Sequence, residues 1–244
     1  MQNRLALITG GTRGIGRATS LRLAQDGWDL VLGYVRDESA AAATRSEAEA
    51  LGVTCSTVRT DLTTDSGIDE LFDAAMSRAG RIDAVVNNAG ATLRISSLAE
   101  TPPPTIRRVI DLNLTSAVLV ARRAVQLLRS GGVLVNVSSG AATTGAPGEY
   151  VHYAAAKAGV DALTKGLAIE VAPRGIRVIG VAPGTVDTQV HADAGEPGRP
   201  ERIARMHPMG RVGRPEEIAS VIAFALSADA GYVAGTTIRA AGGV

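Results

Sequence analysis

Short apolar runs alternate with longer amphipathic stretches along the 244-residue chain. Several of the apolar runs are continuous, which is typical of strands that are buried on both faces of a sheet. In the clearest amphipathic stretch, apolar residues recur at helical spacing after Pro215, a residue suited to the start of a helix. The pattern predicts strands at Leu5–Thr9, Leu30–Tyr34, Thr54–Arg59, Ala84–Asn87, Val133–Val137, Arg177–Val181 and Thr237–Arg239.

Strands that alternate with helices predict an α/β fold with a parallel sheet and right-handed crossovers. A chain of this length can bury one core, and neither a repeat nor a linker interrupts it, so we expect one domain over residues 1–244. The least regular stretch, residues 187–213, is rich in Gly, Pro, Arg and His. Such a stretch late in an α/β chain predicts a mobile lid over a substrate site.

Composition narrows the classes of function. Hydrophobic residues make up 45% of the chain, charged residues 20%, and the net charge is +1, so no nucleic-acid partner is expected. The first apolar run is too short for a signal peptide or a membrane span, and the single cysteine, Cys55, fits a reducing compartment. We therefore expect a cytoplasmic protein without a membrane partner. The histidines at 152, 191 and 207 lack metal-ligand spacing, and we expect no metal site.

A glycine-rich turn follows the first predicted strand and opens a helix. It reads Thr-Gly-Gly-Thr-Arg-Gly-Ile-Gly over residues 9–16. Glycines let the backbone turn tightly and approach a pyrophosphate, and a helix N-terminus offers free N–H groups. The turn therefore predicts a dinucleotide site, with contacts from Gly10, Thr12, Arg13, Gly14, Ile15 and Gly16.

Tyr153 and Lys157 are candidates for acid–base chemistry. They are four residues apart and share one face of a helix. A nearby ammonium lowers the pKa of a tyrosine by favouring the phenolate, which suits a general acid or base. The alternative is a tyrosine packed between helices with an exposed lysine, and the glycine turn favours the catalytic interpretation. Tyr150 has no lysine one turn later, and we interpret it as a substrate-loop residue.

Several motifs occur together in a fixed order. The turn has the spacing Thr-Gly-x-x-x-Gly-x-Gly, and Asn-Asn-Ala-Gly at 87–90, Tyr-x-x-x-Lys at 153–157, Pro-Gly at 183–184 and the stretch 210–217 follow it. In this combination the chain resembles the short-chain dehydrogenase/reductase family over essentially its whole length. Within that family it looks most like the branch of 3-oxoacyl-carrier-protein reductases and glucose dehydrogenases. The resemblance implies a single-domain Rossmann fold, a seven-stranded, mostly parallel, doubly wound sheet with helices on both faces.

The resemblance also implies roles for individual residues. Ser139 would bond the substrate carbonyl oxygen, although one residue more than is usual separates it from Tyr153, which predicts a single insertion in residues 140–152. Asn113 would hold a water that connects Lys157 to solvent, and Thr188 would bond the nicotinamide carboxamide. Further cofactor contacts implied by similarity are Asp61, Leu62, Asn88, Ala89, Gly90, Pro183, Gly184 and Val186, besides Tyr153 and Lys157 themselves.

The end of the second predicted strand bears on the choice of nucleotide. NAD-binding proteins place a carboxylate there for the ribose 2′-hydroxyl, and this chain has Gly33 and Tyr34 instead. Arg13 and Arg36 can bind a 2′-phosphate in a forked geometry, and so we expect NADP(H) to be preferred over NAD(H), with Tyr34 and Arg36 among the contacts. Asp37 is the opposing observation, because it could reach the ribose if the strand were longer.

The function expected from these features is NADPH-dependent reduction of a ketone, aldehyde or 3-oxoacyl group to an alcohol by hydride transfer. One alternative is a catalytically inactive NAD(P)-binding regulatory protein. Others are an NAD-dependent alcohol or sugar dehydrogenase that runs in the oxidative direction, and a dehydratase or epimerase on the same scaffold. The regulatory alternative is disfavoured because Tyr153, Lys157, Ser139 and Asn113 are all present.

The expected partner is a small carbonyl or alcohol substrate, with a carrier-bound acyl group as one form. For a carrier protein, a basic entrance would help docking. Four arginines could form it, although ordinary helix-surface charge is the favoured interpretation: Arg122, Arg123, Arg129 and Arg174. The family resemblance and the small, apolar run over residues 154–171 lead us to expect a homotetramer.

Overall fold

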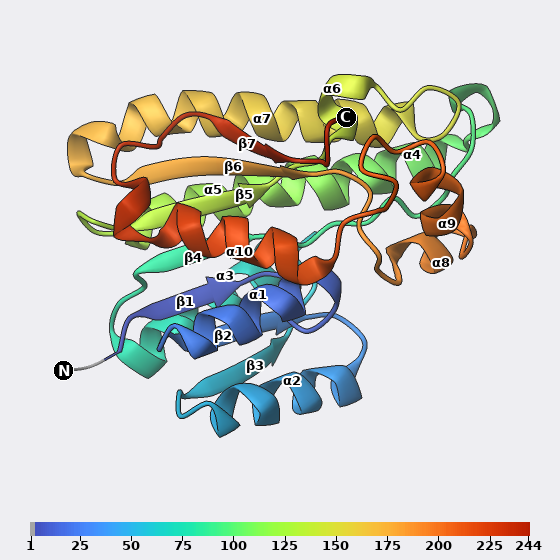
Figure 1. Ribbon diagram of the computed structural model, residues 1–244. Coiled ribbons are helices and arrows are strands. Elements are labelled where there is room, and N and C mark those ends of the chain that lie inside the picture. Colours follow the sequence, from blue (N-terminus) through green and yellow to red (C-terminus); the bar gives the residue numbers. More distant parts are fainter. Residues whose placement is uncertain (1–2) are drawn as a thin grey trace.

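The computed structural model describes residues 3–244 and contains one seven-stranded parallel sheet in the order β3-β2-β1-β4-β5-β6-β7 (Figure 1). Every neighbouring pair of strands runs parallel, as predicted. All seven predicted strands are present, with ends that differ by one or two residues. Their bounds are β1 Leu5–Ile8, β2 Asp29–Tyr34, β3 Cys55–Arg59, β4 Ala84–Asn87, β5 Val133–Val137, β6 Arg177–Pro183 and β7 Thr237–Ala240.

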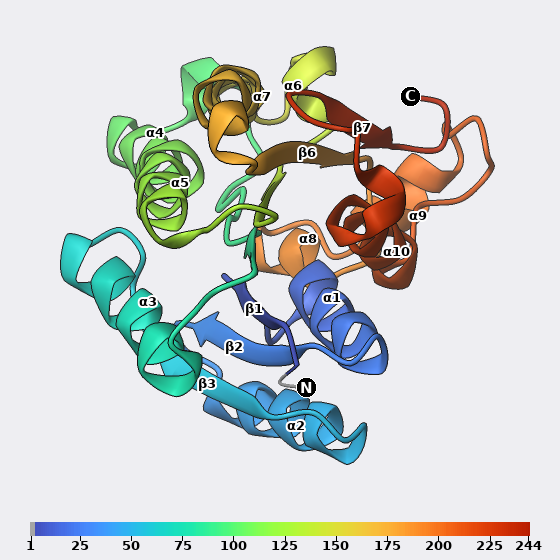
Figure 2. The same ribbon diagram turned by 90° about the vertical axis from the view of Figure 1, so that its left-hand side faces the viewer.

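Helices cover both faces of the sheet (Figure 2). Because side chains alternate along a strand, Ala6 and Ile8 pack into one core, and Leu5 and Leu7 pack into the other. The first core is closed by α1 (Gly14–Gln25), α2 (Glu38–Ala50) and α10 (Pro215–Leu226), and the second by α3 (Asp65–Ala79), α5 (Ser116–Leu127) and α7 (Val151–Val171). The chain is therefore a doubly wound, single-domain Rossmann fold.

Shorter elements connect these layers. The 3₁₀ turns are η1 (Leu98–Glu100), η3 (Ala172–Arg174) and η4 (Ala228–Ala230), and the short helices are α4 (Pro103–Ile110), α6 (Ala141–Thr144), α8 (Val190–Asp193) and α9 (Arg199–Ala204). A π-helical turn, η2 (Asp111–Thr115), joins α4 to α5. No helix among residues 3–244 is long and apolar enough to cross a membrane.

The strand order places a crevice between β1 and β4. The chain winds outward from β1 to β3 and then returns to β4 on the other side. Loops that leave neighbouring strands in opposite directions separate at such a point, and ligands bind there at the carboxyl ends of the strands. The glycine turn follows β1 and Asn88 follows β4, so both motifs lie at this edge.

A buried chain of hydrogen bonds holds the two central strands against the helical layer. The Asn87 side-chain amide donates to the carbonyl of Ala117 (2.9 Å) and to Asn136 Oδ1 (3.1 Å), and Asn136 donates to Thr164 Oγ1 (3.0 Å). All these polar groups are paired, which removes the penalty of their burial. The network therefore orients the ends of β4 and β5 relative to α7.

Candidate active site

The loops after β1 and β4 are bonded to each other. Thr9 Oγ1 accepts hydrogen bonds from the backbone N–H groups of Asn88 and Ala89, both at 2.9 Å. In return, Asn88 Nδ2 donates to the carbonyls of Thr9 (3.0 Å) and Gly10 (3.2 Å). A Cβ on Gly16 would stand 2.0 Å from the Gly10 oxygen, so only glycine permits this close approach.

The N-terminus of α1 directly follows the glycine turn at this edge of the sheet. Its N-cap residue is Arg13, which makes no side-chain capping hydrogen bond, so the first-turn N–H groups of Gly14, Ile15 and Gly16 have no capping side chain. A pyrophosphate fits such a terminus, because free N–H groups and the helix dipole both favour an anion. The Thr188 methyl lies 3.3 Å from where a Cβ on Gly14 would stand, so the chain after β6 lies against the glycine turn.

The residues after β2 resolve the question about Asp37. The strand ends at Tyr34, and Asp37 caps α2 by accepting from Ala40 N (2.9 Å) and Ser39 Oγ (3.0 Å). These hydrogen bonds, first that of Ala40, hold the pKa of the Asp37 carboxyl below its usual range. Arg36 is exposed in the preceding turn. The longer strand that would have aimed Asp37 at a ribose is therefore not formed.

Two other predicted cofactor residues have partners of their own. Arg13 Nη2 lies 3.2 Å from Asp193 Oδ2 in α8, an ion pair in which both side chains are about half exposed. Asp61 Oδ1 accepts from the backbone N–H of Thr63 at 3.0 Å and from its hydroxyl at 2.7 Å, whereas Leu62 is buried. Arg13 thus links the glycine turn to residues 187–213.

The structure brings Tyr153, Lys157 and Ser139 together at the carboxyl edge of the sheet. Tyr153 and Lys157 lie one turn apart on α7, with Lys157 Nζ 5.8 Å from the centre of the Tyr153 ring. Lys157 is buried and donates to the carbonyl of Val137 at the end of β5 (2.8 Å). Ser139, two residues beyond that strand, is hydrogen-bonded to Tyr153 and accepts from Ala141 N (3.1 Å).

Asn113 reaches the same cluster from the π-helical turn η2. Turns of this π-helical kind are frequent at functional sites. Asn113 is buried, accepts from Ala91 N (3.1 Å) and donates to the carbonyls of Ala91 (2.8 Å) and Val109 (2.9 Å). A Cβ on Gly90 would stand 2.6 Å from Asn113 Oδ1 and 3.4 Å from Lys157 Nζ, so Gly90 fits between these two side chains.

Burial dominates the electrostatics of the Tyr–Lys pair. It raises the pKa of Tyr153 to about 12, and the hydrogen bond with Ser139 opposes this increase only in part. Burial also lowers the pKa of Lys157 to about 8, against the attraction of Asp161. This is a correction: we expected Lys157 to lower the pKa of Tyr153, but removal of both groups from water outweighs that effect. At neutral pH the phenol keeps its proton, which suits a proton donor.

The loop after β6 completes this edge. Pro183 ends β6, and its carbonyl accepts from Gly140 N at 2.7 Å. Gly184 packs against Ala241, where a Cβ would stand 2.9 Å from the Ala241 Cα. Val186 is buried and pairs with Gly213, so the two ends of residues 187–213 lie side by side. This segment thus leaves and rejoins the fold beside the catalytic edge.

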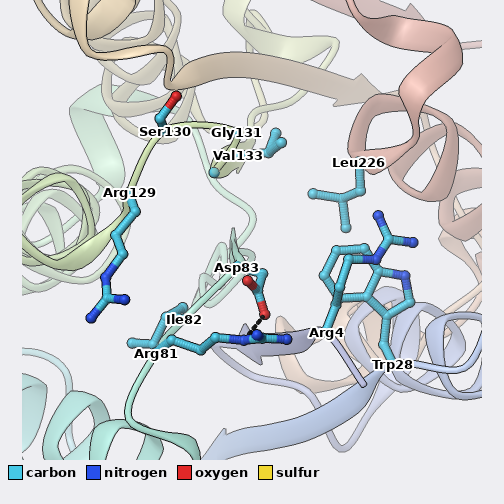
Figure 3. A pocket seen from close by; sticks show the side chains of 11 residues that line it. Arg4, Trp28, Arg81, Ile82, Asp83, Arg129, Ser130, Gly131, Val133 and Leu226 are labelled. Carbon is cyan, nitrogen blue, oxygen red and sulfur yellow. Dashed lines mark hydrogen bonds and ion pairs between the residues drawn. The ribbon is translucent and has the colours of Figure 1, made fainter. Parts of the chain in front are cut away.

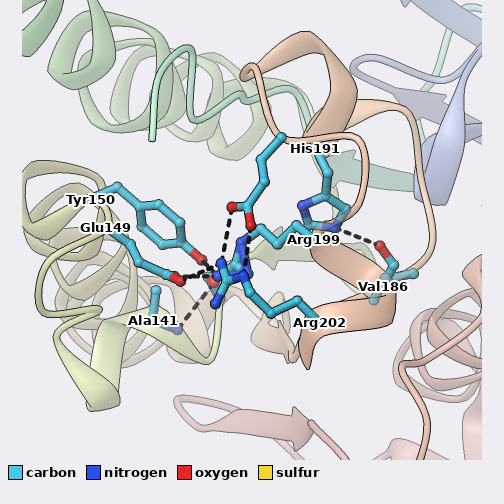
Figure 4. A network of polar contacts seen from close by, with 9 residues as sticks. Ala141, Glu149, Tyr150, Val186, His191, Arg199 and Arg202 are labelled. Carbon is cyan, nitrogen blue, oxygen red and sulfur yellow. Dashed lines mark hydrogen bonds and ion pairs between the residues drawn. The ribbon is translucent and has the colours of Figure 1, made fainter. Parts of the chain in front are cut away.

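Sequence reasoning assigned no role to Arg199 and missed its contact with Tyr150. The rings of Tyr150 and Tyr153 meet edge to face, with centres 5.4 Å apart and planes at 87°. Arg199, in α9, donates to the Tyr150 hydroxyl and to the Glu149 carboxylate (Figure 4). The partners are 49 and 50 residues apart in the sequence, and no local pattern pairs them.

The four arginines proposed as a basic entrance do not surround this edge. Arg129 and Arg174 precede β5 and β6, at the amino ends of the strands, and Arg123 is paired with Asp69 (3.2 Å) and Asp73 (3.1 Å). A pocket of about 150 Å³ at that opposite edge is lined by arginines and a tryptophan (Figure 3). These positions favour ordinary surface charge, the interpretation preferred from the sequence, over a basic entrance for Arg123, Arg129 and Arg174.

Comparisons with known proteins agree with this geometry. A sequence model of the family described as enoyl-(acyl carrier protein) reductase matches residues 10–244. The chain is 41% identical to the uncharacterized oxidoreductase YgfF of Escherichia coli, over 98% of this chain and 99% of that protein. It is 38% identical to a 3-oxoacyl-[acyl-carrier-protein] reductase of Synechocystis, over 99% and 96%. A solved short-chain dehydrogenase from Burkholderia cenocepacia in complex with NADP superposes with a TM-score of 0.93 at 30% identity, covering 99% of this chain and 98% of that one.

A doubly wound parallel sheet with a glycine turn at its switch point is typical of dinucleotide-binding folds, and the sequence matches make the chain an oxidoreductase. The whole-length matches are more specific. The chain belongs to the short-chain dehydrogenase/reductase family, as its motifs indicated.

Proposed function

We propose that the protein reduces a ketone, aldehyde or 3-oxoacyl group to an alcohol with NADPH, and that Tyr153 donates the proton. The observation that carries this proposal is the cluster of Tyr153, Lys157 and Ser139 beside the glycine turn. The 3-oxoacyl-[acyl-carrier-protein] reductase of Synechocystis supports the 3-oxoacyl group as one candidate substrate, free or carrier-bound.

Bound NADPH supplies the hydride that forms the new C–H bond. The Ser139 hydroxyl donates a hydrogen bond to the carbonyl oxygen, which gains charge during the reaction. Tyr153 donates its phenolic proton to that oxygen, which completes the alcohol and leaves a tyrosinate. The Lys157 ammonium stabilises this anion, because the two side chains share one face of α7 and Lys157 is buried. Asn113 contributes through Lys157, by way of a water beside Gly90.

The protonation state of this cluster suits the proton-donating step. Burial raises the pKa of Tyr153 to about 12, so near neutral pH the phenol carries the proton that carbonyl reduction consumes.

The surroundings of Arg36 support a preference for NADP(H) over NAD(H). Asp37 caps α2, so its carboxylate is directed to the N-terminus of that helix and is not placed to bind a ribose hydroxyl near Tyr34. Arg36 is exposed beside the end of β2, and Arg13 lies in the glycine turn. The NADP complex of the Burkholderia relative is consistent with this choice.

Replacing Arg36 tests the nucleotide preference. Arg36→Ala should weaken NADPH binding about tenfold and change NADH binding by less than about twofold, because only the 2′-phosphate loses a forked contact. Arg45→Ala, which removes an exposed arginine of α2 that is paired with Glu49, is the matched control. Fluorescence titration of each reduced cofactor measures the affinities. Equal weakening of both cofactors by Arg36→Ala would count against the assignment.

A carbonyl panel tests the reaction itself. Purified protein is mixed with NADPH and with oxoacyl thioesters, diketones, simple ketones and sugars, while absorbance of the reduced cofactor is followed. Tyr153→Phe should lower kcat at least about 100-fold and leave NADPH affinity unchanged, because only the proton donor is lost. Tyr232→Phe, at a fully exposed tyrosine, is the control. NADPH binding without any turnover would favour a regulatory protein, and alcohol oxidation with NAD as the better cofactor would favour the oxidative alternative.

A substrate lid and an oligomeric state are also proposed. Residues 187–213 act as the substrate lid, since Thr188 lies against Gly14 and both ends of the segment lie at the catalytic edge. Subunits associate as a homotetramer through the helical face that includes Ile169 of α7, an aliphatic side chain that is 71% exposed. Light scattering of the purified protein measures the oligomeric state, and a monomer at micromolar concentration would contradict this assembly.

A further inference from the structure

Arg199 is a buried cation in a segment that is otherwise mostly exposed. Its side chain is 4% exposed, and its Nη2 donates to the Glu149 carboxylate and to the Tyr150 hydroxyl. Its Nε and Nη1 atoms are buried and have no hydrogen-bond partner among the described residues. Burial of a guanidinium is costly unless it is paired, so the two contacts of Nη2 keep this side chain in place.

The charges around Arg199 form a balanced set (Figure 4). Glu149 also accepts from Arg202 Nη2 at 2.9 Å, and Arg202 makes two further bonds to Glu196, at 2.6 and 2.9 Å. The outer pair of Arg202 and Glu196 is partly exposed, and exposed pairs contribute little. The inner pair of Arg199 and Glu149 is more buried, with side chains that are 4% and 23% exposed. Loss of one member would leave the other incompletely paired.

Tyr150 connects this pair to the catalytic tyrosine. Arg199 Cζ lies 5.2 Å from the centre of the Tyr150 ring, and that ring meets Tyr153 edge to face at 5.4 Å. Tyr150 is the N-cap residue of α7, and its carbonyl accepts from Tyr153 N at 3.0 Å. One tyrosine ring thus separates a side chain of α9 from the phenol that is proposed to donate the proton.

The ends of residues 187–213 are anchored independently of Arg199. Asp187 N donates to the Gly213 carbonyl, and Gly213 N donates to the Thr185 carbonyl, both at 2.9 Å. Between these anchors, the ion pairs with Glu149 join α9 to the loop that precedes α7. Movement of α9 away from this loop would therefore break the Arg199 contacts while the base of the segment stays attached.

We propose that Glu149, Tyr150 and Arg199 form a latch that docks residues 187–213, and that Tyr150 is a positioning residue that orients Tyr153 only while the latch is closed. Docking of the segment and alignment of the phenol are then one event. The hydrogen bond from Arg199 fixes the Tyr150 hydroxyl, and the edge-to-face contact transmits that orientation to Tyr153. The positioning role rests on the proposed reductase function, whereas the docking role does not.

Arg199→Met is the central variant, because it removes the cation and keeps an unbranched side chain. It should lower kcat about tenfold and change KM by less than about threefold, because alignment of the proton donor matters most in the transition state. Arg199→Lys retains the charge without the fork and should recover part of kcat. Tyr150→Phe keeps the ring edge but loses the acceptor hydroxyl, and should fall between wild type and Arg199→Met. Arg205→Met, at an exposed arginine at the end of α9, is the matched control and should leave kcat within about twofold.

Two measurements that need no turnover separate the latch from the reaction. Hydrogen exchange should increase over residues 187–213 in Arg199→Met and not in Arg205→Met. The second measurement is nuclear magnetic resonance of protein whose tyrosines are labelled at the ring carbon that bears the hydroxyl. Tyr153→Phe assigns the Tyr153 signal. That signal should shift in Arg199→Met and in Tyr150→Phe, and it should not shift in Arg205→Met.

The docking role and the positioning role of the latch can be overturned separately. Unchanged exchange over residues 187–213 in Arg199→Met would overturn the docking role. Faster exchange with an unshifted Tyr153 signal, or with kcat equal to wild type, would overturn the positioning role. If wild type reduces no carbonyl at all, the proposed reductase function fails and the positioning role fails with it, whereas hydrogen exchange still decides the docking role.

Discussion

Gly16→Ala is the most direct test of how the glycine turn works. Gly16 lies in the first turn of α1, where its backbone crosses the Gly10 carbonyl. A Cβ at this position would stand 2.0 Å from the Gly10 oxygen, 2.9 Å from the Gly10 carbonyl carbon and 2.7 Å from Asn88 Nδ2. Two of these three atoms belong to the backbone, and the third is bonded to the carbonyls of Thr9 and Gly10. No flexible side chain can yield, so the turn itself must move.

The size of the effect follows from these distances. Ordinary contacts of a carbon with oxygen or carbon lie near 3.3 to 4 Å, so the turn and the helix must separate by about 1 Å or more. Overpacking of this kind costs about 1 to 3 kcal/mol of unfolding free energy. The same displacement moves the N–H groups of Gly14 and Ile15 away from the pyrophosphate position. Because hydrogen bonds weaken over such a shift, NADPH affinity should fall at least about tenfold.

The assay pairs urea unfolding with fluorescence titration of NADPH. Gly198→Ala is the matched control, since Gly198 has a φ of −83° and nothing lies within 4 Å of its added Cβ. The control should gain up to about 1 kcal/mol, because alanine loses less conformational entropy on folding than glycine does. If Gly16→Ala were as stable as wild type and bound NADPH equally well, the close approach of Gly16 to Gly10 would not be what shapes this site.

Three further predictions concern buried polar groups. Burial lowers the pKa of Lys157 to about 8 from the ordinary lysine value of 10.5, so between these pH values the unfolded chain binds a proton that the folded chain does not, and stability rises with pH. Lys157→Met removes this slope, and urea unfolding should show wild type gaining roughly 2 kcal/mol relative to the variant across that range. A constant difference between the two proteins would contradict this prediction. Burial raises the pKa of the Cys55 thiol to about 12, so iodoacetamide should label Cys55 in urea and scarcely in the native protein; rapid native labelling would refute its burial. Asn136→Leu removes the partner of Asn87 and Thr164 and should cost about 2 kcal/mol in urea unfolding, whereas a neutral result would show that the network carries little stability.

Much of the fold could be read from local patterns. Short apolar runs predicted all seven strands, and several of the runs are continuous because strands buried on both faces have no polar side. The ends of β1 and β6 differed from prediction by one or two residues, since hydrogen-bond partners on neighbouring strands decide where pairing stops. The π turn at Asn113 was not predicted, because its sequence pattern is that of an ordinary helix.

The sequence predicted which residues form the candidate site, but it did not predict the direction of the Tyr153 pKa shift. The four-residue spacing of Tyr153 and Lys157 placed them on one helix face, which is a local property. The direction of the Tyr153 pKa shift was wrong, because it depends on how completely the fold removes the phenol from water. The role of Asp37 was left open by the sequence and was decided by the end of β2 and the start of α2.

The sequence by itself determined the alternation of strands and helices, the glycine turn and the Tyr–Lys spacing. Each of these depends on residues within about one helical turn or one strand of each other, where backbone geometry and periodicity act. Only the tertiary structure decided that Arg13 pairs with Asp193, 180 residues away, and that Arg199 docks beside Tyr150. Such contacts depend on which loops the sheet topology brings to one edge and on how completely the fold excludes water there. Neither can be read from a short stretch of the sequence.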